Sequence, residues 1–112
     1  MSLYTHEETF LHDTDDRGVL RACLRGQAAD LATTLKRRHL AAHTIQVKAR
    51  YGDFTTLTRQ LTVEEPIAEP RDIYRLGCYL LGRERLVRRP LQLLGLGVSN
   101  LREPTAQQLM LL

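Results

Sequence analysis

The clearest alternation of apolar and polar residues in this chain runs through residues 44–63. Every second residue is apolar along most of this stretch, and a period of two places the apolar side chains on one face of a strand. Gly52-Asp53 divides the stretch and is typical of a turn, so the pattern predicts a β-hairpin. The opposite face carries hydroxyls, amides and two cations, Lys48 and Arg50. We expect this polar face to be the working surface.

Two further strands are predicted near the ends of the chain. Residues 3–10 alternate in the same way and are typical of an edge strand. Residues 91–101 are mostly apolar, but Leu93 and Leu96 differ in parity. A bulge near Gly95 would bring both leucines to the core face, because a bulge adds one residue to one strand of a pair.

Apolar residues spaced three and four apart predict two amphipathic helices, over residues 16–39 and from Pro70 to about Arg85. The side chains of residues 13–16 can cap the first helix, and proline suits the first position of the second. Residues 64–70 are predicted to form a loop. Gly77 interrupts the second helix at a cost of about 1 kcal/mol relative to alanine, which indicates close contact with the sheet.

The predicted order of elements is strand, helix, strand, strand, helix, strand. Each helix has one apolar stripe and each strand one apolar face, so both helices must cover the same side of the sheet. The expected fold is therefore an α+β two-layer sandwich, β-α-β-β-α-β, with a four-stranded antiparallel sheet whose other face is open. We expect this domain to occupy residues 1–102 and a flexible tail to occupy residues 103–112.

Composition narrows the class of protein. A chain of 112 residues is long enough for one domain, and no apolar run approaches the roughly 20 residues that span a bilayer. Cys23 and Cys78 lie in apolar helical patterns, so two buried thiols in a reducing cytoplasm are expected rather than a disulfide. The bases between Lys36 and Arg59 are opposed by a single acid, Asp53. Such a stretch suits a polyanion, although a solvated arginine-rich surface is the alternative.

No catalytic or metal-binding arrangement is visible in the sequence. His39 and His43 are four residues apart but straddle the expected end of a helix, and Ser99 has no base nearby. A glycine-rich phosphate loop is absent. The few aromatic residues form no stripe on the polar face, which argues against a base-stacking RNA platform. We therefore expect no cofactor in this chain.

Three segments resemble the C-terminal little-finger domain of Y-family translesion DNA polymerases of the bacterial polymerase IV type. They are HEETF (residues 6–10), VKARYGDFTTLTR (47–59) and RPLQLLGLGVSNL (89–101), and the resemblance that they carry extends over almost the whole chain in the right order. The resemblance implies a sheet that lies along the major-groove side of primer–template DNA and grips its phosphates. It also implies that the catalytic carboxylates and Mg²⁺ belong to a palm domain, so we expect no polymerisation by this chain alone.

The DNA contacts implied by the resemblance come from the first strand, the hairpin and the last strand. Arg59 has the parity of the core face, so a local twist or bulge must turn it outward, while Glu7 is expected to act through its backbone N–H. Basic residues that some relatives carry near Gln92 and Gly97 are absent here, so the grip is expected to be weaker or to rest more on Lys48 and Arg50. The expected DNA-binding residues are Thr5, Glu7, Thr9, Lys48, Arg50, Thr56, Thr58, Arg59, Gln60 and Gln92.

The last five residues, Gln108 to Leu112, are similar to the peptide by which bacterial polymerases bind the sliding clamp. A flexible tail would present a glutamine for hydrogen bonding and leucines for an apolar pocket. A hydrophobic tail that packs on its own domain is the alternative. The expected clamp-binding residues are Gln108, Leu109, Leu111 and Leu112.

The leading expectation is a cytoplasmic, monomeric DNA-binding accessory domain of an error-prone translesion polymerase. Its partners would be duplex primer–template DNA, the sliding clamp and the catalytic domains of its parent, and no membrane. The alternative is a protein-interaction module whose open sheet face binds a partner or a second copy. A small metabolic enzyme would need a pocket with convergent titratable groups, which the sequence does not indicate.

Overall fold

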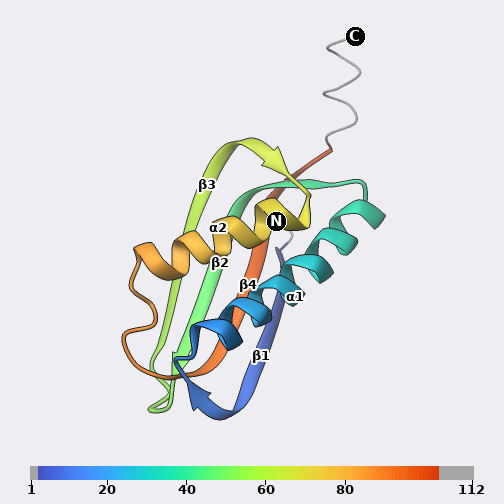
Figure 1. The fold of residues 1–112 in the computed structure, drawn as a ribbon. Coiled ribbons are helices and arrows are strands. Elements are labelled where there is room, and N and C mark those ends of the chain that lie inside the picture. The colour runs from blue at the N-terminus through green and yellow to red at the C-terminus, as the bar shows by residue number, and fades with distance from the viewer. Residues whose placement is uncertain (1–2, 104–112) are drawn as a thin grey trace.

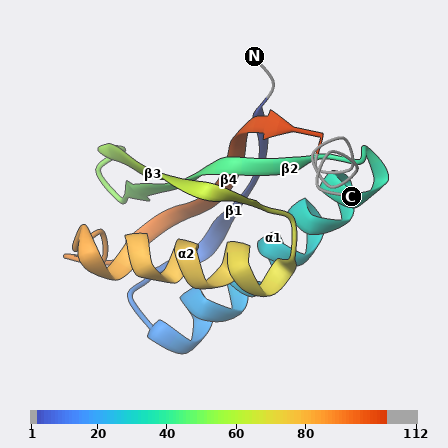
Figure 2. The same cartoon turned by 90° about the horizontal axis from the view of Figure 1, so that it is seen from above.

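The computed structural model describes residues 3–103, which form four strands and two helices (Figure 1). The strands make one antiparallel sheet in the order β1-β4-β2-β3. Both helices lie on one side of this sheet (Figure 2), so the predicted two-layer α+β sandwich is confirmed. The elements are β1 (Leu3–Thr14), α1 (Arg17–Arg37), β2 (Ala41–Tyr51), β3 (Thr56–Ile67), α2 (Pro70–Arg83) and β4 (Leu91–Arg102).

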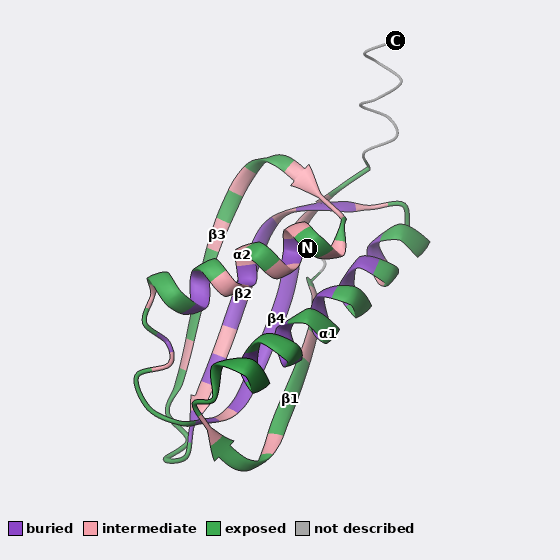
Figure 3. Cartoon of the chain, viewed as in Figure 1, coloured by how far each residue is buried: buried purple, intermediate pink, exposed green. Residues whose placement is uncertain are grey.

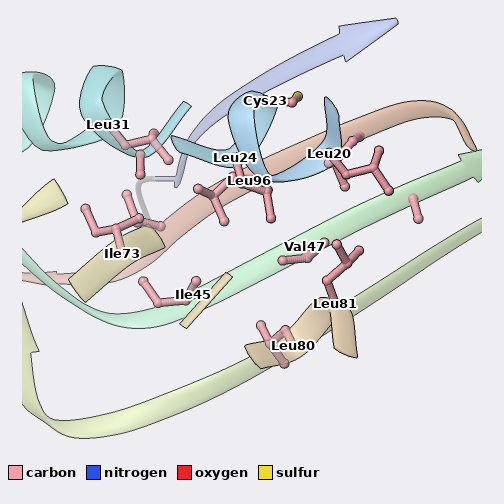
Figure 4. Close-up of a cluster of buried hydrophobic side chains, with 14 of the residues drawn as sticks. Leu20, Cys23, Leu24, Leu31, Ile45, Val47, Ile73, Leu80, Leu81 and Leu96 are labelled. Atoms are coloured by element: carbon pink, nitrogen blue, oxygen red, sulfur yellow. The ribbon is translucent and has the colours of Figure 1, made fainter. Parts of the chain in front are cut away.

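The hydrophobic core lies between the helices and the facing side of the sheet (Figure 4). The predicted alternation in β2 is confirmed, because Ile45, Val47, Ala49 and Tyr51 are all buried. Burying a leucine or isoleucine side chain contributes roughly 1.5–3 kcal/mol each, so this layer supplies most of the driving force for folding. The central strands β2 and β4 are the most buried, whereas the edge strands β1 and β3 alternate between exposed and half-buried residues (Figure 3).

Both helices begin as the sequence predicts. The carboxylate of Asp16 accepts a hydrogen bond from the backbone N–H of Val19 at 3.0 Å and caps α1. Pro70 lies in the first turn of α2, after the N-cap residue Glu69. Gly77 packs closely on the sheet, because a Cβ atom there would lie 3.0 Å from Cδ1 of Leu96.

Both helices end on a non-glycine residue in the left-handed region, which sequence patterns do not reveal. His39 follows α1 with φ 55° and Arg85 follows α2 with φ 50°. After α1, the N–H of His39 donates to the carbonyl of Lys36 and the N–H of Leu40 to that of Leu35. This pair of bonds is the Schellman motif, in which glycine is the usual residue at the left-handed position.

The bulge in β4 lies at Gln92, so its expected position near Gly95 is wrong. Leu93 pairs with Arg50 whereas Leu91 pairs with the next residue of β2, which leaves Gln92 as the extra residue. Gly95 belongs to a regular part of the ladder. Leu93 therefore has the register of the open face, not of the core face. The residues of β4 that face the core after the bulge are Leu94, Leu96 and Val98.

Two strands are longer than expected and one turn differs. β1 continues past Phe10 to Thr14, and β3 continues to Ile67, so only the end of the predicted loop over residues 64–70 is correct. In the hairpin loop the left-handed residue is Phe54, with φ 69°, rather than a glycine. At the opposite end of the sheet Leu3 pairs with Ser99, so the first and last strands lie side by side.

Both cysteines are free thiols. Cys23 is buried, and this burial, together with the negative charge of Glu8, raises the pKa of its thiol to about 11. Cys78 is only half-buried, so full burial is confirmed for one of the two predicted thiols. Within residues 3–103, neither helix has the length and apolar character needed to cross a bilayer.

Candidate nucleic-acid interface

We call the side of the sheet opposite the helices the open face. None of the described elements covers it (Figure 2). Directly paired residues in an antiparallel sheet place their side chains on the same face, so the strand register groups the open-face residues into rows across the sheet. The three central rows are Thr5, Gly97, Gln46 and Gln60; Glu7, Gly95, Lys48 and Thr58; and Thr9, Leu93, Arg50 and Thr56.

The rows bring together the predicted DNA-binding residues of β1, β2 and β3, with the exception of Arg59. They are mostly hydroxyl, amide and charged side chains, which can donate hydrogen bonds or positive charge to phosphate oxygens. Leu93 is the only large apolar residue in these three rows, and it is 4% exposed. The three rows are therefore hydrophilic, as the alternation in the sequence predicts.

Arg50 is held on the open face by two neighbours. Its Nε donates a hydrogen bond to Oε1 of Gln92 at 2.9 Å, so the bulge brings the predicted residue Gln92 to this surface. Its guanidinium also lies 6.0 Å from the ring centre of Phe54, at the outer limit of a cation–π contact. Phe54 is 70% exposed in the hairpin loop. Arg50 is thus positioned in advance while its remaining donors stay available.

Lys48 and Glu7 form an ion pair across β4, with 2.9 Å between Nζ and Oε2. They can meet because Gly95, which lies between them in the same row, has no side chain. Both side chains remain more than a third exposed, so the pair contributes about 0–1 kcal/mol to stability. The pair neutralises one of the two cations in the three central rows.

Gly95 and Gly97 form the floor of a shallow depression, the glycine trough, whose walls include Thr5 and Gln46. A Cβ atom at Gly97 would lie 2.9 Å from Cγ2 of Thr5 and 3.0 Å from Cγ of Gln46, so this position requires glycine. Glycine within a strand often marks a site where another backbone or a ligand approaches closely. Both glycines are themselves buried, because side chains of β1 and β2 meet over them.

Arg59 does not lie on the open face, so the expected outward turn is wrong. It pairs with Val47 in an unbroken part of the hairpin ladder, and Val47 faces the core. Its Nε lies 3.3 Å from Oε1 of Glu84, the C-cap residue of α2. Arg59 therefore links the edge strand to the helical layer.

Sequence reasoning missed Gln46 and the glycine trough as parts of the site. The alternation in β2 places Gln46 on the polar face, which was the signal for it. Gly97 gave no such signal, because the close approach of its neighbours follows from strand order rather than from any local pattern. Lys36, in the basic stretch, pairs with Glu69 at 3.1 Å and lies in the last turn of α1. The predicted clamp-binding residues Gln108, Leu109, Leu111 and Leu112 lie outside the described residues.

The described residues contain no group of three or more His, Cys, Asp or Glu side chains that could hold a metal ion. The open face instead offers hydrogen-bond donors on side chains and unpaired backbone groups on its edge strands β1 and β3. Such a surface fits an extended anionic partner rather than a small ligand.

Comparison with known proteins gives a consistent result. Residues 3–111 match the family described as "impB/mucB/samB family C-terminal domain". DNA polymerase IV of Halorhodospira halophila is 35% identical over 102 residues, which cover 91% of this chain and 29% of that protein. DNA polymerase IV of Dehalococcoides mccartyi is 36% identical over 104 residues, 92% of this chain and 27% of that protein. The chain thus spans less than a third of these relatives.

Solved structures share the fold at low sequence identity. A complex of the beta-clamp processivity factor and the little finger domain of PolIV gives a TM-score of 0.71 at 21% identity, covering 88% of this chain and 87% of that chain. A post-insertion binary complex of Dbh DNA polymerase gives a TM-score of 0.75 at 22% identity, covering 88% of this chain and 28% of that chain. From its sequence, the chain belongs to the impB/mucB/samB C-terminal domain family, and it shares its fold with the little finger domain of PolIV in the clamp complex.

Proposed function

We propose that this chain is the DNA-binding accessory domain of an error-prone translesion DNA polymerase and that it grips duplex primer–template DNA through the open face. The observation that carries the proposal is the set of three polar rows across an uncovered sheet. The relatives that match it are named DNA polymerase IV, and the Dbh structures that share its fold include post-insertion and insertion complexes.

Recognition on this surface would be independent of sequence. Hydroxyl and amide side chains donate to phosphate oxygens without reading bases, and the exposed edges of β1 and β3 add backbone N–H groups. Glu7 would contribute through its backbone, as the resemblance implies, because its carboxylate repels phosphate.

Lys48 would exchange partners when DNA binds. In the structure its ammonium pairs with Glu7, so a phosphate must replace that carboxylate. Arg50 is already held by Gln92 and can add a charge-assisted bond to a phosphate. Two cations on one face favour weak binding, roughly 10⁻⁴ to 10⁻⁶ M at physiological salt, as for non-specific complexes.

A titration of labelled duplex DNA at several salt concentrations tests the proposal. Changing Lys48→Ala and Arg50→Ala together should weaken binding to all sequences alike and reduce the slope of log K against log salt by about 1 per residue. The matched control is Arg71→Ala with Arg75→Ala, which removes the same charge from exposed positions on α2.

Equal losses in the two double variants would contradict a DNA site on the open face, since only net charge would then matter. Binding that is tight, insensitive to salt or specific for one sequence would also contradict it. If the domain binds no duplex at any salt and self-associates through the open face, the protein-interaction alternative replaces this proposal.

The rest of the proposed function lies outside the described residues. The parent protein would be a cytoplasmic DNA polymerase whose palm domain holds Mg²⁺, and this domain by itself would be monomeric. Residues 108–112 would bind the sliding clamp. Measuring clamp binding with and without Leu111 and Leu112 tests the tail separately, because the truncation should abolish clamp binding and leave duplex binding unchanged. Full clamp binding by the truncated chain would remove the tail from the proposal.

A further inference from the structure

A second candidate site lies on the helical side of the molecule, away from the open face. A pocket of about 380 Å³ opens between the first turns of α1 on one side and, on the other, the last turns of α2 and the segment that follows α2. Figure 1 shows that α1 begins and α2 ends at the same end of the molecule. The volume falls within the range of about 300–1,000 Å³ typical of ligand sites.

The interior of the pocket is apolar. Leu20 of α1 and Leu81 of α2 are buried beneath it, and Cys78 and Val87 are half-buried in its wall. Gly82 widens the opening, because a Cβ atom there would meet nothing within 4 Å. This surface can accept one large apolar side chain of a partner.

The rim of the pocket is positively charged. Arg17 and Arg21 come from α1, and Arg85 and Arg88 follow the helical residues of α2. All four are exposed, and none of them forms an ion pair with another described residue. Glu84, the acid directly before Arg85, is already shared by two other arginines.

Acids near the start of α1 offset only part of this charge. Asp16 faces the backbone of its own helix, because its carboxylate caps α1. Asp13 and Asp15 precede Arg17 in sequence but form no ion pair with it. The Nε of Arg88 donates to the carbonyl of Arg85, and the other donors of the four guanidinium groups remain available for carboxylates, which guanidinium groups bind in a bidentate manner.

We infer that this pocket binds an acidic peptide segment of a partner protein, with one large apolar side chain on the floor and carboxylates on the arginine rim. Charge complementarity favours an acidic partner, and the apolar floor adds the requirement that this partner carry a large apolar side chain. A nucleic acid fits less well, because no aromatic ring lines the pocket to stack on a base. The site does not depend on the proposed function of the open face.

Binding can be measured with synthetic peptides and the full chain. The probe is a labelled hexapeptide of aspartates with one phenylalanine. The controls are a peptide with the phenylalanine replaced by serine and a peptide with all aspartates replaced by asparagine. We expect the probe to bind at least ten times more tightly than either control.

Cys78 provides a local report of occupancy. Saturating peptide should slow modification of Cys78 by a thiol reagent at least tenfold, whereas Cys23, which is buried, should remain unmodified throughout. Protection of Cys78 by single-stranded oligonucleotide but not by the peptide would overturn the assignment. Equal binding of the serine peptide would also overturn it, because the apolar floor would then have no role.

Charge reversal at the rim completes the test. Arg21→Glu with Arg88→Glu should weaken peptide binding at least tenfold, and Arg71→Glu with Arg75→Glu, which changes the net charge equally outside the pocket, should leave it unchanged. Equal weakening by both pairs would overturn the pocket as the site. Circular dichroism of both double variants should be native, since all four positions are exposed.

Discussion

Glu7 and Lys48 show how single residues can limit the affinity of the open face. The carboxylate of Glu7 satisfies the ammonium of Lys48 and also presents negative charge to any approaching phosphate. A phosphate that binds Lys48 must therefore displace a partner only 2.9 Å away, and it must do so beside a like charge.

Replacing Glu7→Gln should tighten duplex binding by about three- to tenfold, because the competing charge is removed while the chain length is kept. The slope of log K against log salt should change little, because Lys48 neutralises one phosphate in both proteins. Glu8→Gln is the matched control. Glu8 is also exposed, but it pairs with Leu94 and so belongs to the face of the sheet that the helices cover. Unchanged or weaker binding by Glu7→Gln would place DNA elsewhere.

Asp53 fixes the hairpin loop through its carboxylate. It accepts hydrogen bonds from the backbone N–H of Thr55 and from Arg89, each at 3.0 Å. The bond from Thr55, aided by Arg89, lowers the pKa of the Asp53 carboxyl below its ordinary value of 3.8. A lowered folded-state pKa means that the ionised form stabilises the fold at neutral pH.

This stabilisation should be present above the ordinary pKa of Asp53 and lost as the pH falls through its lower folded-state value. Asp53→Asn should therefore lower the melting temperature at pH 7. At pH 2–3 the melting temperatures of the variant and the wild type should differ less. Asp30→Asn, on the exposed side of α1, serves as a control. A difference between wild type and Asp53→Asn that grows toward acid pH would contradict this assignment.

At the scale of elements, the contact between α2 and β4 depends on the absence of a side chain at Gly77. A Cβ atom there would lie 3.0 Å from Leu96, which is 1% exposed and has little room to move. Overpacking of a core typically costs about 1–3 kcal/mol, whereas replacing a helical glycine by alanine gains up to about 1 kcal/mol.

Gly77→Ala should therefore destabilise the domain by about 1 kcal/mol, and Gly26→Ala should stabilise it by up to about 1 kcal/mol. Gly26 is the matched control because it is also helical and a Cβ atom there would meet nothing within 4 Å. Urea unfolding of both variants measures the free energies. Equal stabilisation by the two substitutions would show that α2 can move away from the sheet.

Most elements, and most of the open face, could be predicted from the sequence because a period of two or of 3.6 reports which side of an element is buried. The bulge at Gln92 could not be located, since residues 91–101 are nearly all apolar and their parity change fits several positions. Arg59 was assigned by resemblance against its own parity, and the register of the hairpin shows that parity was the better guide. The pocket depends on how two helices lie on the sheet, which no local pattern encodes.

At the scale of the whole molecule, the two central strands and the two edge strands differ in protection. β2 and β4 are paired on both sides and are mostly buried, whereas β1 and β3 each have one unpaired edge. Local openings in proteins begin where backbone hydrogen bonds are exposed and apolar contacts are few.

Amide hydrogen exchange should therefore be slowest in β2 and β4 and faster in β1 and β3. Duplex DNA should slow exchange further in the edge strands β1 and β3, while the acidic peptide should slow it near the start of α1 and the end of α2. Mass spectrometry of peptic fragments can separate these regions. Protection by DNA confined to the helices would contradict both surface assignments.

The pairing of Leu3 with Ser99 brings the start of β1 and the final part of β4 to one end of the sheet. On the proposed function, a linker from the catalytic domains and a peptide leading to the clamp would both attach at this end. The opposite end, with the hairpin loop, would have no covalent tether. The domain could then pivot about its attachment point, and the hairpin loop would travel farthest while the two tethers stayed together.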